Sequence, residues 1–270
     1  MSLILNKEHP VVRLRAFRAV DDPKACELFI EGHEQVLTNI GVTKVTSSKN
    51  EWMTNPSTFV LIVESLDKEK VFGGARVQVA DGKKMLPIEA ATGGMDSKIF
   101  QLVWKYAQQG TGEICGLWNS REIAGYGVGS IFLTRAAVAI SSQIGITSLF
   151  ALCAPYTVKM AESVGYQIEK RVGNEGTFYY PKLDLLATTM LLADVNALAS
   201  AEEENRSAIF KIRKQTNLVR IERLRRKEIE IHYETQIPFL ETWDLNTVLS
   251  NVQKSGLSDT SETAVNINTI

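Results

Sequence analysis

The residues best suited to chemistry are three closely spaced glycines, Gly125, Gly127 and Gly129, which follow a short apolar run and precede an amphipathic segment. Glycine leaves backbone N–H groups open to a ligand because no Cβ stands in the way. The first turn of a helix has unpaired N–H groups and a partial positive charge. A strand, a glycine loop and a helix in this order therefore form an anion site that suits a pyrophosphate.

The spacing of these glycines differs from that of two common phosphate-binding loops. Gly129 is followed by Ser130 and Ile131, so the dinucleotide-binding pattern G-x-G-x-x-G is not completed. The Gly-Lys-Ser/Thr of a P-loop is also missing. On the glycines alone two interpretations stay open: a phosphate cradle, or a flexible loop that lets a helix pack close to a sheet.

Composition limits the classes of protein to consider. The 270 residues are enough for one substantial core and a small second module. A net charge of −1 gives no indication of a nucleic-acid or anionic-membrane partner, and no apolar run is long enough to span a bilayer. Cys26, Cys115 and Cys153 are odd in number and far apart, which predicts reduced thiols in a cytoplasmic protein. The histidines have no metal-ligand spacing.

Apolar periodicity predicts the elements that position the loop. Residues 11–18 alternate between apolar and basic side chains, as a half-buried strand does. Residues 41–57 are polar and are expected to form a loop with one short helix. Strands are predicted at 11–18, 59–64, 71–80, 114–118, 146–154, 166–172 and 185–195, and helices at 21–39, 97–110, 131–145 and 155–164. This order predicts a mixed sheet covered by helices on both faces.

The run from Ala124 to Ser130, AGYGVGS, resembles the acyl-CoA pyrophosphate loop of the GNAT superfamily of N-acyltransferases, which reads Arg/Gln-x-x-Gly-x-Gly/Ala. Gly127 and Gly129 fall on its two glycines, whereas Ala124 replaces the Arg or Gln. Ser163 to Tyr166 is similar to the family's Lys-Leu-Gly-Phe. Tyr179-Tyr180-Pro181, followed by an Ala and a Met, resembles the tail of many members.

The resemblance spans residues 11–195 and implies the family's fold. That fold is α/β (α+β), with a GNAT-like central mixed, mostly antiparallel sheet flanked by helices on both faces. The predicted acyltransferase domain is 1–195, with an insertion at 81–110. The resemblance also implies acyl-CoA, most simply acetyl-CoA, as co-substrate, with its pantetheine paired to the strand before the loop. The implied binding residues are Leu117, Trp118, Asn119, Ala124, Gly125, Tyr126, Gly127, Val128, Gly129 and Ser130.

Acyl transfer to an amine needs a base, and it gains from an acid that protonates the departing thiolate. Glu113, on the strand before the loop, is the candidate base, because burial would raise its pKa; a surface glutamate is the alternative. The family's usual tyrosine would fall on Ala161. Tyr156, earlier on the same helix, is the candidate acid or a packing residue. Cys115 and Cys153 have no histidine nearby, so buried structural thiols are favoured over an acyl-cysteine.

Residues 196–270 extend past the resemblance. We expect a C-terminal helical extension at 196–253, with a basic helix and a short strand, and a disordered tail at 254–270. Arg206 to Lys227 contains nine Lys or Arg and one acid, Glu222, which gives 9 − 1 = +8. Two interpretations stay open: a solvated helix face, or a docking surface for an acyl carrier protein, CoA phosphates or nucleic acid.

The sequence thus predicts a cytoplasmic N-acyltransferase that moves an acyl group, most simply acetyl, from acyl-CoA to a primary amine of a small molecule or peptide. One alternative uses acyl carrier protein as the donor, as autoinducer and N-acyl amino acid synthases do. Another is a sensor that binds acyl-CoA without catalysis. No metal or membrane partner is expected, and an oligomer is compatible with the sequence.

Overall fold

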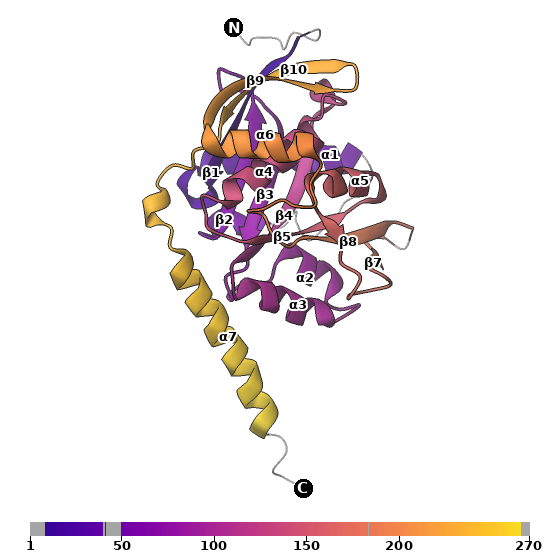
Figure 1. Cartoon of the computed structure of the whole chain (residues 1–270), viewed down its shortest axis with the longest axis vertical. Coiled ribbons are helices and arrows are strands. Elements are labelled where there is room, and N and C mark those ends of the chain that lie inside the picture. The colour runs from indigo at the N-terminus through magenta and orange to yellow at the C-terminus, as the bar shows by residue number, and fades with distance from the viewer. Residues whose placement is uncertain (1–8, 40, 42–49, 183, 266–270) are drawn as a thin grey trace.

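One mixed sheet organises the protein (Figure 1). The computed structural model describes residues 9–39, 41, 50–182 and 184–265. The strand order is β6-β8-β5-β4-β3-β2-β1-β10-β9, with β7 paired to β8. Neighbours are antiparallel except β4–β5 and β1–β10. The strands are β1 (Val11–Arg18), β2 (Thr58–Glu64), β3 (Val71–Val79), β4 (Thr111–Asn119), β5 (Ser148–Cys153), β6 (Gln167–Ile168), β7 (Thr177–Tyr179), β8 (Leu186–Leu192), β9 (Asn217–Leu224) and β10 (Lys227–Glu234).

Helices cover both faces of this sheet, as predicted. Along β2, Leu61 and Val63 belong to the core under α4, whereas Val60 and Ile62 pack with Phe29 of α1. This alternation follows from the two-residue period of a strand. Helices α1, α2 and α3 lie on one face, and α4, α5 and α6 lie on the other. The helices are α1 (Pro23–Asn39), α2 (Pro87–Thr92), α3 (Lys98–Ala107), α4 (Leu133–Ser141), α5 (Pro155–Val164), α6 (Glu203–Lys214) and α7 (Leu245–Val265).

The prediction of one basic helix through Lys227 is wrong beyond Lys214. Helix α6 ends there, and residues 217–224 form β9 at the edge of the sheet. Strand β9 pairs with β10 over eight residue pairs, and β10 joins β1 in parallel. The β-branched side chains of Val219 and Ile221 suit a strand, and the ladder with β10 decides against the weaker helical preference of the arginines.

A buried ionic network joins this C-terminal hairpin to the central helix. Arg135 of α4 is 4% exposed; its Nε donates to Asn205 of α6 (2.7 Å), and it pairs with Glu204 (2.9 Å) and Glu222 of β9 (3.3 Å). The hydroxyl of Tyr233 donates to Glu222 (2.9 Å). Helix α6 also lies alongside α4 (Figure 1). The hairpin is thus held by the same body that carries the glycine loop.

The Glu222→Gln variant is expected to lower the free energy of unfolding by about 3 kcal/mol, because the Arg135 guanidinium then loses the buried one of its two acidic partners, and Arg220, which also pairs with Glu222 (2.9 Å), loses its acid. Urea denaturation measures this loss. Glu122→Gln is the matched control, since its pair with Lys70 is about half exposed (50% and 45%) and should contribute less than about 1 kcal/mol. Losses of less than about 1 kcal/mol in both variants would contradict a stabilising role for the network.

The sequence predicts a disordered tail at 254–270, but helix α7 extends through this segment as far as Val265. Asp244 caps the helix, since its carboxylate accepts the N–H groups of Asn246 (3.0 Å) and Thr247 (3.2 Å). Val248 and Val252 are buried against the body, and the helix then projects away from it to Val265 (Figure 1). The cap and these two contacts start the helix. Residues 266–270 lie outside the described residues. Within the described part of the chain, no helix is long and apolar enough to cross a membrane.

Candidate functional site

Strand β4 is distorted shortly before the glycine loop. Its register with β3 shifts between the Gly74–Trp118 pair and the Arg76–Cys115 pair, which places one extra residue in β4. Gly116 lies in this bulge with φ +60°, a left-handed conformation that suits glycine. Bulges re-aim a strand, and they occur often beside active sites.

The two central strands part at the same level. The parallel pairing of β4 with β5 ends at Ile114 and Ala151, although β4 continues to Asn119 and β5 to Cys153. Beyond that point no described strand pairs with this edge of β4, and we call this unpaired region of β4 and β5 the gap. Backbone N–H and C=O groups along such an edge are available to an extended ligand that carries amides.

The glycines allow a close approach between the end of β4 and the start of the central helix. A Cβ on Gly129 would lie 2.1 Å from Oδ1 of Asn119, and a Cβ on Gly127 would lie 2.8 Å from Cε2 of Phe132. Gly127 also has φ +83°. Both positions therefore need glycine for packing. This agrees with the interpretation that the loop lets a helix pack close to the sheet.

The loop enters the helix through a π-type turn, Val128–Phe132, before α4 begins. The N–H groups of Ser130 and Phe132 donate to the carbonyl of Gly127 (3.3 and 3.1 Å). The amides of Val128 and Gly129 belong to the first turn, where helix geometry supplies no acceptor. They are the donors of the loop best placed for an anion.

The remaining residues of the predicted donor site differ in what they expose. Ala124 and Gly125 are exposed, and Tyr126 is half-buried. The Trp118 ring is buried against α1, edge-on to Phe29 with ring centroids 5.8 Å apart. Trp118 can therefore meet a ligand in the gap through its backbone, since its side chain belongs to the core.

Glu113 lies one residue before β4 and β5 part, on the face that α2 covers. It is 2% exposed, and its Oε2 accepts the N–H of Ile88 (2.7 Å). Burial raises the pKa of Glu113 to about 8, although the Ile88 hydrogen bond and the nearby Arg76 guanidinium lower it. The carboxylate is thus a stronger base than an exposed glutamate and titrates near neutral pH.

Tyr166 lies on the other face of the sheet, in the core beneath α4 and α5. It is 2% exposed, and within the described part of the chain its hydroxyl has no hydrogen-bond partner. Burial, with smaller effects from Cys153 and Glu113, raises the pKa of Tyr166 well above 10, so the phenol stays protonated. An unpaired buried hydroxyl calls for a partner that the chain does not supply.

The sequence analysis did not identify Tyr166, because it considered only the family's usual tyrosine position, which falls on Ala161, and Tyr156 earlier on the same helix. The available signal was the Gly165-Tyr166 pair, where a phenol replaces the family's phenylalanine. Tyr156, the predicted acid, is 84% exposed at the start of α5 and does not join the buried groups. Burial raises the pKa of Cys115 to about 12 and that of Cys153 to about 11, which disfavours a thiolate nucleophile.

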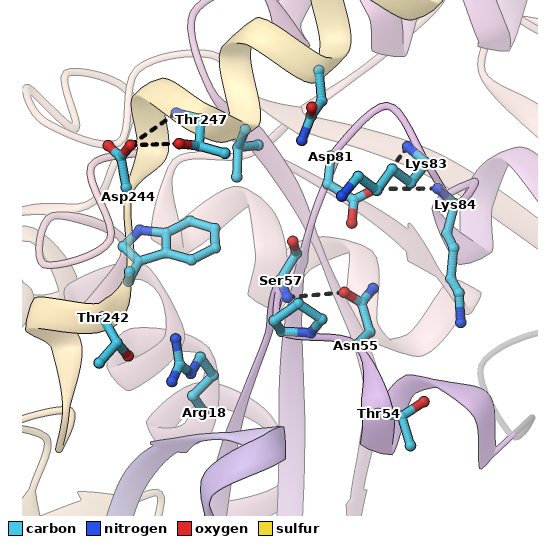
Figure 2. A pocket seen from close by; sticks show the side chains of 14 residues that line it. Arg18, Thr54, Asn55, Ser57, Asp81, Lys83, Lys84, Thr242, Asp244 and Thr247 are labelled. Atoms are coloured by element: carbon cyan, nitrogen blue, oxygen red, sulfur yellow. Dashed lines mark hydrogen bonds between the residues drawn. The ribbon is translucent and has the colours of Figure 1, made fainter.

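A cavity of about 330 Å³ lies between the first turns of α7 and the loop after β3 (Figure 2). Asp81, Lys83 and Asp244 are among its lining residues. Asn119, at the glycine loop, pairs with Gly73 at the opposite end of β3. Strand β3 has 9 residues, which span roughly 30 Å at about 3.3 Å per residue. The cavity therefore lies near the end of β3 that is opposite to the glycine loop.

The sequence matches no family model and no curated protein. Among solved structures, FeeM, an N-acyl amino acid synthase from uncultured soil microbes, matches with TM-score 0.54 and 13% identity, over 73% of this chain and 97% of FeeM. BjaI, a CoA-dependent acyl-homoserine lactone synthase, gives 0.49 and 12%, over 91% and 99%. Spermidine N-acetyltransferase of Vibrio cholerae gives 0.43 and 14%, over 73% and 100%. The fold rests on the FeeM match: the chain has the fold of the GNAT acyltransferases, as its glycine loop and element order predict.

Proposed function

We propose that this protein is an N-acyltransferase that takes an acyl group from acyl-CoA and transfers it to a primary amine. The observation that carries the proposal is the parting of β4 and β5 after Ile114 and Ala151, directly before the glycine loop. A thioester that enters this gap would reach the middle of the sheet. Its phosphates would remain at the open start of the helix, where anions are stabilised.

The donor would be held mainly by backbone. In the resemblance to GNAT enzymes, the strand before the loop pairs with the pantetheine amides, and residues 117–119 offer such an edge. The pyrophosphate would then bind residues 124–130, chiefly through the amides of Val128 and Gly129. Backbone contacts of this kind do not require the Arg or Gln that Ala124 replaces.

The reaction needs a proton to leave the amine and a proton to reach the thiolate. The neutral amine attacks the thioester carbonyl, and the tetrahedral adduct then collapses with cleavage of the C–S bond. Glu113 would accept the amine proton, directly or through a water molecule, and the phenol of Tyr166 would donate a proton to the leaving sulfur. These groups lie on opposite faces of the sheet, so acceptor and donor would enter from opposite sides.

A turnover assay separates an enzyme from a sensor. The protein is incubated with acetyl-CoA or longer acyl-CoA and a panel of amines, beginning with amino acids because FeeM is an N-acyl amino acid synthase. Release of CoA thiol and formation of the acyl amide are measured. Amine-dependent release is expected. Binding of CoA without release would favour the sensor, and release with acyl carrier protein alone would assign that donor instead.

Tyr166→Phe tests the acid in the same assay, because it removes a single oxygen from a buried ring. A lower kcat with unchanged CoA affinity is expected, since the phenol acts only when the C–S bond breaks. An unchanged kcat would remove Tyr166 from the mechanism and leave the thiolate to depart unassisted.

A further inference from the structure

The turn between β9 and β10 carries a dense group of cations. We name residues 223–227 the basic tip; they include Arg223, Arg225, Arg226 and Lys227. The hairpin is closed by the pair Leu224–Lys227, and Arg225 has φ +58° in the tight turn.

The basic tip lies directly on the glycine loop. Nζ of Lys227 donates to the carbonyl oxygen of Ala124 (3.0 Å) and stands 4.4 Å from the ring centroid of Tyr126. On the same side, Cδ2 of Leu224 lies 3.1 Å from the position that a Cβ on Gly127 would occupy. Residues about one hundred positions apart in the sequence therefore form one surface.

The body of the protein holds the tip in this place. Strand β10 continues the sheet beside β1, with Val11 opposite Glu230. Ile229 is buried, and Glu222 of β9 is fixed by the guanidinium of Arg135. A hairpin supported on both strands loses little conformational freedom when its tip binds a ligand.

Among the described residues, three of the four cations of the tip form no ion pair with an acid. Arg223 is paired with Glu228 (2.7 Å), but no ion pair among the described residues includes Arg225, Arg226 or Lys227, all of which are exposed. Glu122, the acid of the loop, is paired with Lys70 (2.7 Å). Positive charge thus accumulates at the open start of the central helix, whose dipole has the same sign.

We propose that the basic tip is a phosphate clamp for CoA, formed by the C-terminal hairpin in place of the side chain that Ala124 lacks. Arg225, Arg226 and Lys227 bind the pyrophosphate and 3′-phosphate, while the loop amides bind from the other side. The inference rests on the proposed function. The nucleotide is favoured over a carrier protein because Lys227 contacts the loop itself, where the donor phosphates would lie.

Binding of CoA, dephospho-CoA and pantetheine to the full chain tests the clamp, by isothermal titration at low salt. The variants are Arg225→Ala/Arg226→Ala and Lys227→Met, which keeps most of the stem over Tyr126. Each is expected to weaken CoA binding by at least about tenfold, because charge-assisted hydrogen bonds to phosphate are lost. Pantetheine affinity should not change, and dephospho-CoA should lie between. The salt dependence of CoA binding should also decrease.

Lys98→Ala/Lys105→Ala is the matched control, since both lysines are exposed on α3, on the opposite face of the sheet. Wild-type CoA affinity in the tip variants would overturn the clamp and leave the proposed function intact. Equal losses for CoA and pantetheine would mean that the tip only shapes the loop. In the turnover assay, a loss of rate in the tip variants confined to acylated carrier protein as donor would make the tip a docking surface instead. Failure of the wild type to bind CoA would contradict the proposed function itself.

Discussion

Glu113→Gln is expected to lower kcat by at least about 100-fold, the contribution of a positioned general base, and to change CoA affinity by less than about twofold. The substitution keeps an acceptor for the N–H of Ile88 and removes only the basicity. The pKa of Glu113 is about 8, and the base must be ionised. In the wild type, kcat should therefore rise with pH up to about 8 and then level off, and the variant should lose this rise.

The same variant gives a stability test that does not depend on turnover. The pKa of Glu113 in the folded state, about 8, lies above its ordinary value of 4.5. The folded wild type therefore binds an extra proton between these values, and its free energy of unfolding falls as pH rises from about 4.5 to about 8. Glu113→Gln cannot titrate, so in urea its stability relative to the wild type should be higher at pH 8.5 than at pH 5.

Two results would contradict this assignment. Unchanged kcat and pH dependence in Glu113→Gln would remove the carboxylate from the mechanism. A stability difference between variant and wild type that does not change with pH would show that burial does not raise the pKa of Glu113. Glu122→Gln, at an exposed and paired position, controls for the general effect of losing one negative charge near the loop.

Gly129→Val is expected to weaken CoA binding by at least about 100-fold. Its Cβ would lie 2.1 Å from Oδ1 and 2.6 Å from Cβ of Asn119. Because the Cβ of Asn119 moves only with the backbone, the end of β4 and the helix start must move apart. The amides of Val128 and Gly129 would then no longer converge on one anion. Gly129 is a better position than Gly127, because its φ of −78° is open to any residue, and its replacement adds no backbone strain.

Gly94→Val is the matched control for this variant. Gly94 is exposed, and a Cβ placed on it has no atom within 4 Å. Its CoA affinity and melting temperature should equal those of the wild type. Folded Gly129→Val protein, shown by circular dichroism, with wild-type CoA affinity would mean that the loop serves packing alone.

Sequence periodicity predicted the parts of the fold that local signals specify. The alternation over 11–18, the proline at Pro23 and the glycine loop each placed an element correctly, because propensity, capping and pattern agree there. Helix α2 was missed because its six residues, Pro87–Thr92, are too few for a periodic signal.

The features that the sequence did not predict depend on contacts between residues far apart in the chain. Residues 217–224 form a strand because they pair with β10, and that pairing cannot be read from their arginine-rich composition. The parting of β4 from β5 comes just before a bulge at Gly116, a glycine that no local pattern singles out. The contact of Lys227 with Ala124 joins residues 103 positions apart. The sequence therefore shows the charge of the basic run, but not that the run lies beside the glycine loop.

The central claim is that the gap between β4 and β5, with the glycine loop, binds acyl-CoA. The most direct test is the melting temperature of the full chain during titration with CoA, because a ligand that binds the folded state stabilises it by mass action. At a hundredfold excess over Kd the stabilisation is about 2.7 kcal/mol, which corresponds to a rise of roughly 5 °C for a chain of this size. We predict that rise in the wild type and in Gly94→Val, and its loss in Gly129→Val. No rise in the wild type at saturating CoA would contradict the account.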